Sequence, residues 1–253
     1  NQMSNNWVMG RGARVDFSMS PPQVSTGLKA YTSHSSSAIS DSLSNLLFYT
    51  HGDSIYNAAY NTMPNGENLV GSGKYSFQGV ITVPYSGNPH QYYVFNVSDK
   101  EDTISHPGKL LYGGLVCHVV DMSLDGGLGD VIIRDSVIFE VTDSVSTFEQ
   151  RITAARHAND TDYWIIVRKW DGTGTSHFYT YLLDSNGLNP PIISGPSQTV
   201  NGLGYLGEMK VAPDGSKIAM TAGKLGLATG MLDPNYLEVF CFNNQSGKAA
   251  PST

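Results

Sequence analysis

The sequence is poor in charged residues. Aspartate, glutamate, lysine and arginine together make up 15% of the 253 residues, against about 25% in an average globular protein. The net charge is −7, and lysine and arginine form no cluster along the chain. A nucleic acid is therefore not expected as a partner, because binding to a phosphate backbone requires a concentrated positive charge.

Cysteine is also scarce. The two cysteines, Cys117 and Cys241, are too few for a disulfide framework. Each lies in an apolar stretch, GLVCHVV and LEVFCF, without a CxxC motif or a neighbouring histidine pair. We expect both to be small, buried side chains with free thiols, and neither a disulfide nor a metal site is predicted for them.

Long apolar runs are missing as well. No stretch approaches the roughly 18 apolar residues of a membrane-spanning helix, so the chain is not predicted to span a membrane. The printed sequence opens with NQMSNNW, without an initiator methionine or an apolar leader. We therefore expect a processed or trimmed chain from which an export signal has been removed.

The residues that are present favour β-structure. The chain has 14 tyrosines and 27 glycines, together with many serine, threonine and asparagine residues. Aromatic and β-branched side chains favour strands, and glycine and asparagine favour turns. No useful window keeps the i, i+3, i+4, i+7 apolar pattern of an amphipathic helix. The sequence therefore predicts an all-β fold.

A strand–turn–strand pattern recurs along the chain. Residues 211–221 read VAPDGSKIAMT, in which Pro213-Asp214-Gly215 supplies a tight turn with a positive φ at the glycine. Residues 38–50, 79–97 and 153–167 repeat the pattern with other polar turns. These hairpins predict one structural unit that is used several times.

Third strands follow the hairpins, most clearly at residues 113–133, 178–194 and 237–247. Antiparallel units of three or four strands that repeat about every 50 residues are typical of a β-propeller. We count about four such blades, plus an N-terminal strand pair at residues 7–17, and we assign residues 1–253 to one propeller domain. A β-sandwich is the main alternative fold.

Two long motifs carry a resemblance to a known family: NLLFYTHGDSIYNAAYNTMPNG at residues 45–66 and DMSLDGGLGDV at residues 121–131. With shorter motifs along most of the chain, they resemble the N-terminal β-propeller region of large exported proteins of the Bacteroidetes. Many of these are gliding-motility-associated or PKD-domain-containing proteins with a C-terminal sorting domain for type IX secretion. The resemblance implies an exported, cell-surface or secreted propeller with further domains downstream, and it implies no set of catalytic residues.

The sequence departs from this family in two places. His34-Ser35-Ser36-Ser37 stands where family members often have Gly-Cys, and residues 224–235 form a long insertion. Any function that depends on these loops is therefore not carried over.

The blade count predicts an incomplete ring. The family resemblance implies about seven blades, within the known range of about four to eight, so we expect the ring to continue beyond the printed chain. A small closed propeller of four or five blades is the alternative. An open end would expose an apolar sheet face, to which some of Val211, Ile218, Val239 and Phe240 should contribute.

DGGLGD, at residues 125–130, is the most suggestive metal motif. Asp125 and Asp130 could offer oxygen ligands to Ca²⁺, but the stretch lacks the alternating ligands and the closing glutamate of an EF-hand loop. We favour a glycine-rich turn capped by aspartates, a role also indicated by Asp121 and Asp184 at matching repeat positions. No cofactor is predicted, with Ca²⁺ at this turn as the alternative.

No motif predicts catalysis. The seven histidines never occur as HxH, HxxH or HExxH, and no serine stands in a GxSxG elbow. Asp41, Asp53, Glu101 and Asp102 are candidate carboxylates for a glycosidase-like pair, although acidic residues in turns usually cap the backbone. We therefore expect a protein that is not an enzyme.

Aromatic residues on second strands, such as Trp164, are expected to pack between blades. Trp170 and Tyr205 lie beside glycines and loops, and they are the candidate residues for binding a protein or a surface glycan. We expect a binding or scaffold module of an exported surface protein that makes protein contacts in a secretion, motility or surface assembly. A glycan-binding adhesive module and a hydrolase or lyase with a central-channel site are the alternatives.

Overall fold

The computed structural model describes residues 2–31, 35–71, 76–98, 113–140, 147–198, 207–222 and 236–252. In these ranges antiparallel strands dominate, and the helical segments are two short 3-10 helices, η1 (Gln2–Ser4) and η2 (Asp125–Gly127). Neither has the length or the apolar character that crossing a membrane requires. The prediction of an all-β fold is confirmed.

The strands form five small sheets, which we number in chain order. Sheet 1 contains β1 (Asn6–Met9), β2 (Arg11–Asp16) and β3 (Gln23–Tyr31). Sheet 2 contains β4 (Ser37–Ser40), β5 (Leu46–Thr50) and β6 (Ile55–Asn57). Sheet 3 contains β7 (Val80–Pro84), β8 (Gln91–Val97), β9 (Leu115–Asp121) and β10 (Asp130–Phe139).

The two C-terminal sheets have the same meandering order. Sheet 4 contains β11 (Thr147–Arg156), β12 (Tyr163–Trp170), β13 (Thr175–Asp184), β14 (Gly187–Leu188) and β15 (Ile192–Gln198). Sheet 5 contains β16 (Met209–Val211), β17 (Lys217–Ala222), β18 (Tyr236–Asn243) and β19 (Lys248–Pro251). The described strands therefore form five sheets, where a β-sandwich would have two.

The four predicted hairpins are confirmed as the antiparallel pairs β4–β5, β7–β8, β11–β12 and β16–β17. Each hairpin is formed by the first two strands of its sheet, and a third strand follows in all four. The N-terminal strand pair is β1–β2, but β3 joins it and makes it a full three-stranded sheet. The described part of the chain thus contains five units where the sequence indicated four and a strand pair.

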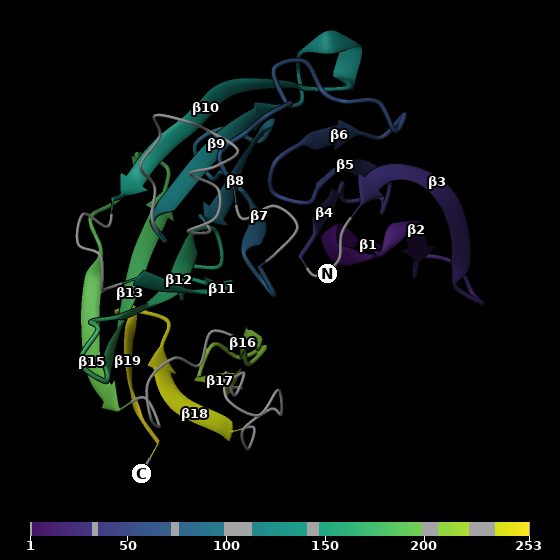
Figure 1. Ribbon diagram of the computed structural model, residues 1–253. Helices are drawn as coiled ribbons and strands as arrows, with labels where there is room; N and C mark the ends of the chain where they lie inside the picture. The colour runs from purple at the N-terminus through teal and green to yellow at the C-terminus, as the bar shows by residue number, and fades with distance from the viewer. Residues whose placement is uncertain are drawn as a thin grey trace, which may run out of the picture.

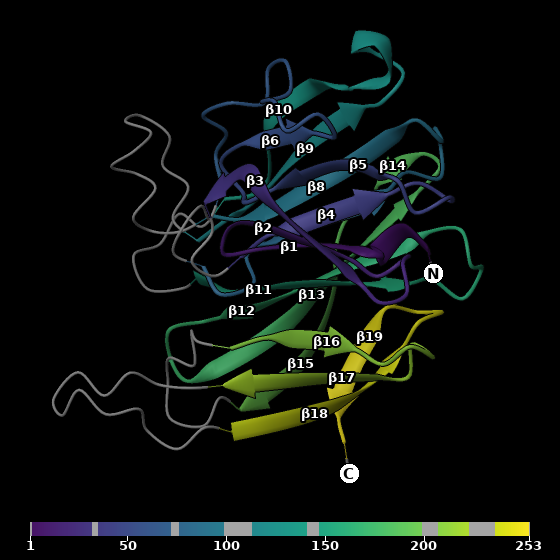
Figure 2. The ribbon, with the colours of Figure 1, turned by 90° about the vertical axis from the view of Figure 1, so that its right-hand side faces the viewer.

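The five sheets follow one another along an arc, from purple sheet 1 to yellow sheet 5 (Figure 1). The first strands of consecutive sheets contact each other, so that β1, β4, β7, β11 and β16 lie next to one another along the chain of sheets. In the side view, sheet 5 lies below sheet 4, and the other sheets lie above them (Figure 2). The described strands do not close into a ring.

Apolar cores fill the spaces between consecutive sheets. Tyr49 and Tyr56 of sheet 2 pack on Val8 and Leu28 of sheet 1, and three further clusters lie between sheets 2 and 3, 3 and 4, and 4 and 5. Each cluster takes side chains from both of the sheets that it joins. The sheets are therefore held together by face-to-face burial of apolar side chains.

Strand β12 shows how an inner sheet is buried on both faces. Successive side chains of a strand point to opposite faces. Ile165 and Val167 belong to the cluster shared with sheet 3, whereas Trp164 and Ile166 belong to the cluster shared with sheet 5. All four are buried, which confirms the expected packing of Trp164 between units.

Gln78 connects three sheets at their first strands. Just before β7, its N–H donates to the carbonyl of Gln150 (3.3 Å), and its carbonyl accepts from the N–H of Ile152 (2.9 Å), both in β11. Its side chain then pairs with the backbone of Met209 in β16, donating from Nε2 (2.9 Å) and accepting at Oε1 (2.6 Å). One residue therefore links sheets 3, 4 and 5.

Sheets 4 and 5 also share a buried network of charged side chains. Arg168 lies 2.8 Å from Oε2 of Glu238 and 3.6 Å from Oε1 of Glu149. Arg151 contacts Glu149 and also donates to the carbonyl of Thr221. The network pairs two arginines with two glutamates, so that no net charge is placed in this interior.

Aspartates cap many of the turns. The Oδ1 atoms of Asp121 and Asp214 accept from both the N–H and the hydroxyl of the serine two residues later, and Oδ1 of Asp184 accepts from the N–H of Asn186. This confirms the predicted turn role of Asp121 and Asp184. Gly215 has the expected positive φ, at 71°, which a residue without a side chain adopts at little cost.

The two cysteines differ from each other. Cys117 of β9 is buried as predicted, and desolvation raises the pKa of its thiol to about 11. For Cys241 of β18 the prediction of burial was wrong, since this side chain is exposed. Its neighbours Phe240 and Phe242 point toward sheet 4, and alternation along the strand therefore directs Cys241 to the opposite face of sheet 5.

Candidate functional site

The outer face of sheet 1 is apolar and exposed. Asn6 and Val8 of β1 are buried toward sheet 2, whereas Trp7 and Met9 alternate with them and are 55% and 41% exposed. Trp7 is opposite Val15, which is opposite Val24, itself 70% exposed. The rings of Trp7 and Phe17 pack with centroids 5.0 Å apart. We define Trp7, Met9, Phe17 and Val24 as the outer face of sheet 1.

The outer face of sheet 5 has the same character. Along β18, Phe240 and Phe242 are buried against sheet 4, whereas Leu237 and Val239 are 69% and 37% exposed. Cys241 is exposed on this side as well. We define Leu237, Val239 and Cys241 as the outer face of sheet 5, and the two outer faces together as the end faces.

The end faces were only partly visible in the sequence. Of the four residues expected near an open face, Val239 lies on it, whereas Ile218 and Phe240 pack toward sheet 4 and Val211 packs against the same inner cluster. The face of sheet 1 was missed, although NWVM in β1 has apolar residues at both parities. A strand that is apolar on both faces is typical of a sheet covered on both sides.

A groove lies between sheets 4 and 5, on the side where the hairpin turns meet. Its volume is about 740 Å³, within the range of about 300–1,000 Å³ of small-molecule sites. Ala154 and Arg156 of β11 form one wall, and Val211 and the turn that follows it form the other. Ser86 donates to Asp162 (2.7 Å), and the N–H of Ala158 donates to the carbonyl of Asn244 (3.1 Å), so neighbouring turns are bonded together around it.

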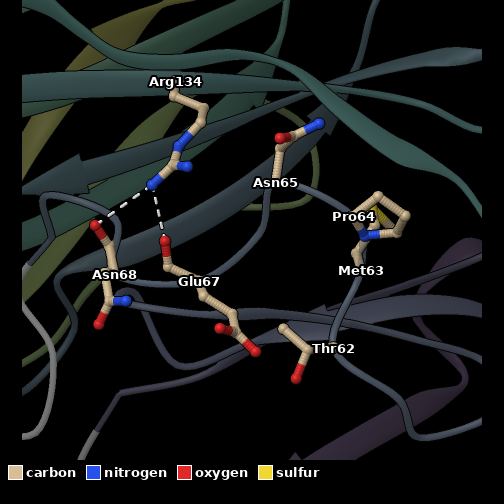
Figure 3. A pocket seen from close by; sticks show the side chains of 7 residues that line it. All are labelled: Thr62, Met63, Pro64, Asn65, Glu67, Asn68 and Arg134. Carbon is tan, nitrogen blue, oxygen red and sulfur yellow. Dashed lines mark hydrogen bonds between the residues drawn. The ribbon is translucent and has the colours of Figure 1, made fainter.

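A second, smaller hollow of about 410 Å³ lies between the loop after β6 and β10 (Figure 3). Arg134 points into it, and its Nη2 donates to the carbonyls of Glu67 (2.7 Å) and Asn68 (3.4 Å). Thr62, Met63, Pro64 and Asn65 form the rest of the lining. Among the lining residues of this hollow, Arg134 carries the positive charge.

The candidate calcium ligands flank the nearby turn between β9 and β10. Asp125 is exposed in η2, with a positive φ of 48°, and Asp130 begins β10, where its Oδ1 accepts from Nδ2 of Asn65 (2.9 Å). Within the described ranges, no three histidine, cysteine, aspartate or glutamate side chains gather as metal ligands. The turn has the glycine-rich geometry that the sequence indicated, with positive φ at Gly126, Gly127 and Gly129.

Of the two candidate binding aromatics, the structure describes Trp170. Trp170 ends β12 and is half-buried, and its indole Nε1 is buried among the described residues rather than presented to solvent. Tyr205 lies outside the described residues. The proposed role of Trp170 in binding therefore stays a prediction.

The candidate carboxylates are separated. Asp41 caps the β4–β5 turn, where it accepts from Leu43 and Asn45, and Asp53 follows β5 at its opposite end, 2.8 Å from Nδ1 of His51. Strand β5 therefore lies between them, and they do not form a pair. Glu101 and Asp102 lie outside the described residues.

Comparisons with known proteins assign no family. No family model matches the chain, and no curated protein is similar to it in sequence. Among solved structures, the chain is similar to a protein of unknown function from Dyadobacter fermentans DSM 18053, with 11% sequence identity and a TM-score of 0.35. The similarity covers 99% of this chain and 56% of that one, so the chain spans about half the length of that protein.

Proposed function

We propose that the five sheets are consecutive blades of a β-propeller whose ring is completed by further blades. In this proposal the protein is a non-enzymatic binding or scaffold module of an exported cell-surface protein. Its partners are proteins of a secretion, motility or surface assembly, together with downstream domains of its own polypeptide.

The observation that carries the proposal is the pair of exposed apolar end faces. Sheets 2, 3 and 4 have apolar side chains on both faces, and neighbouring sheets cover them. Sheets 1 and 5 have the same two-sided composition, but in the described part of the chain a sheet covers them on one side alone. A contiguous apolar surface of this kind marks an interaction site in a soluble protein. A further blade on each end face would continue the same packing.

Three other features support the propeller. The strands of each sheet are antiparallel and pair in chain order, except that β15 pairs with β13. The first strands of the sheets are neighbours, and the arc that the sheets follow is open (Figure 1). An array in which most contacts join consecutive units is the arrangement of repeat folds. The resemblance of residues 45–66 and 121–131 to exported Bacteroidetes propellers supports the surface location and the ring of about seven blades.

Dye binding by residues 1–253 tests the proposal. The chain should bind anilinonaphthalene sulfonate under native conditions, because the dye reports exposed apolar surface. The combined change Trp7→Gln, Val24→Thr and Leu237→Thr should lower the fluorescence by about half or more, since it removes apolar area from both end faces. Leu43→Thr is the matched control, because Leu43 is an exposed leucine at the β4–β5 turn that belongs to neither end face.

The contrary result is also clear. A monodisperse monomer of residues 1–253 that melts cooperatively and binds no dye would support a complete small propeller instead. Equal loss of fluorescence in Leu43→Thr and in the end-face variant would show that the end faces are not the source of the signal.

A further inference from the structure

Strand β11 leaves one backbone edge free beside the groove. It pairs with β12 in regular register from Ile152 to Arg156. The N–H of Ile152 donates to Gln78, which means that the backbone groups of Ile152 point away from β12. Because these groups alternate between the two edges of a strand, Ala154 and Arg156 direct their N–H and C=O groups to the same edge. In the described ranges, no backbone group pairs with them there.

Strand β16 presents a second edge to the same groove. The N–H and C=O groups of Met209 bind the side chain of Gln78 and so point away from β17. Val211, two residues further on, directs its backbone groups the same way and lines the groove. The groove therefore lies between two strand edges whose hydrogen-bonding groups are available.

The contacts of Gln78 show that the edge of β11 binds an extended main chain. It forms a parallel bridge with Arg151, so an extended main chain already adds to this edge one step before the groove begins. Past Ile152 the edge continues in the same register to Ala154 and Arg156. The backbone N–H and C=O groups that bind Gln78 are thus repeated at Ala154 and Arg156, where a second extended segment fits.

The walls of the groove indicate the side chains of such a segment. The lining includes small side chains, among them Ala155, which faces sheet 5, and Ala212. Asp160 and Asp214 both line the groove. Ser216 donates to Oδ1 of Asp214, and this hydrogen bond, together with the nearby positive charge of Lys217, lowers the pKa of the Asp214 carboxyl. The remaining charged lining residue, Arg156, already donates to the carbonyl of Asp160 (3.2 Å). With a net charge of −7 for the chain, the groove favours a basic ligand.

We propose that this groove binds an extended peptide that adds to the free edge of β11 and places a lysine or arginine side chain between Asp160 and Asp214. Strand addition of this kind takes affinity from backbone hydrogen bonds and specificity from side-chain pockets. The inference rests on the proposed role as a protein-binding module and names the ligand class of that role. A saccharide is less well suited, because Arg156 lies over the ring of Tyr163, 5.9 Å from its centroid.

The test begins with a phage-displayed library of random linear peptides selected on immobilised residues 1–253. Enriched peptides should contain lysine or arginine next to β-forming residues. Synthetic copies are then titrated by fluorescence anisotropy, beside copies with alternate backbone amides N-methylated. N-methylation should weaken binding about thirtyfold, because it removes the two backbone hydrogen bonds of strand addition at about 1 kcal/mol each.

Two variants locate the site by different means. Ala154→Pro removes the free-edge donor, and proline is tolerated where the N–H faces away from the ladder. Ala212→Trp fills the groove and leaves every backbone donor in place, so it stays informative if the proline variant does not fold. Each should weaken binding about tenfold or more, while thermal melting shows that the folded variant keeps its stability.

Charge is tested separately. The double change Asp160→Asn and Asp214→Asn should weaken basic peptides severalfold and leave neutral peptides unchanged. Asp125→Asn, an exposed aspartate outside the groove lining, is the matched control and should have no effect.

Three results would overturn the inference. The first is a selection without enriched peptides, the second is peptide binding that neither Ala154→Pro nor Ala212→Trp weakens, and the third is an oligosaccharide array in which a sugar binds and Ala212→Trp blocks it. If peptides bind and the end-face substitutions weaken them instead, the groove proposal fails and the proposed binding module stands.

Discussion

Sheet 4 and sheet 5 are built from similar strands but differ in what covers them. Along β12 of sheet 4, side chains of both parities are buried, between sheet 3 on one side and sheet 5 on the other. Along β18 of sheet 5, one parity is buried and the other, Leu237, Val239 and Cys241, is exposed. Both strands have apolar residues at even and at odd positions, so the difference lies in their neighbours. Exposed apolar faces of this kind mark interaction sites in soluble proteins, and the proposed ring rests on this observation.

The largest expected effect on stability distinguishes the buried side of β18 from its exposed side. Phe240→Ala should destabilise the protein by about 3–5 kcal/mol, because it leaves a cavity between sheets 4 and 5. Val239→Ala, one residue away on the outer face, should cost less than about 1 kcal/mol. Urea unfolding of both variants checks the difference, and similar losses would mean that both faces of sheet 5 are buried.

Gln78 tests how the inner ends of the sheets are held. Gln78→Ala removes the two hydrogen bonds to Met209 and leaves its backbone groups without these partners, which should cost about 1–3 kcal/mol. Gln23→Ala is the control, since Gln23 is exposed at the start of β3, and a surface change of this kind should stay within about 0.5 kcal/mol. If Gln78→Ala and Gln23→Ala were equally stable in urea unfolding, Gln78 would not stabilise the contact between the sheets.

Two glycine turns separate backbone strain from crowding. Gly215 and Gly10 both have a positive φ, but a side chain at Gly215 would meet Asn244 at 2.7 Å, whereas nothing lies within 4 Å of one at Gly10. Gly215→Val should therefore cost about 1–3 kcal/mol, and more than Gly10→Val. Thermal melts of the two variants measure this, and an unchanged melt for Gly215→Val would refute the turn assignment.

Acid should weaken the turns gradually. Hydrogen bonds from Ser18, Ser123 and Ser216 lower the pKa of Asp16, Asp121 and Asp214 below the usual 3.8. A carboxylate with a lowered folded-state pKa stabilises the protein above its unfolded pKa, and this stability is lost as the pH falls through the folded value. The melting temperature should therefore decrease as the pH is lowered below about 4. The substitution Asp121→Asn should make the melting temperature less dependent on pH in this range. A melting temperature unchanged from pH 6 to pH 3 would contradict it.

Much of the fold was readable in the sequence because local signals determine hairpins. Turns such as Pro213-Asp214-Gly215 and the alternation around them predicted the first two strands of four sheets, and the repeat predicted their order. The sheet at the N-terminus was counted one strand short, because β3 follows a turn of serines and prolines at residues 18–22 without a strong hairpin signal. The burial of Cys241 was mispredicted for another reason. An apolar strand looks the same whether or not a further sheet covers it.

The candidate sites were harder to predict, since they depend on contacts between distant segments. The groove joins the edges of β11 and β16, more than fifty residues apart in the sequence, and backbone edges leave no residue signature. The separation of Asp41 and Asp53 likewise follows from the strand between them. Trp170 was selected for its place beside a glycine turn, but the direction of its indole depends on the packing of sheet 4.

The most direct test of the central account uses the reactivity of the two thiols to show whether a further sheet covers the outer face of sheet 5. In residues 1–253, a thiol reagent should modify exposed Cys241 rapidly and buried Cys117 only after unfolding. In the longer polypeptide that the proposed ring requires, with further blades on the end faces, Cys241 should become as slow to react as Cys117. Equal, rapid labelling of Cys241 in both proteins would contradict the account, because no blade would then cover the outer face of sheet 5.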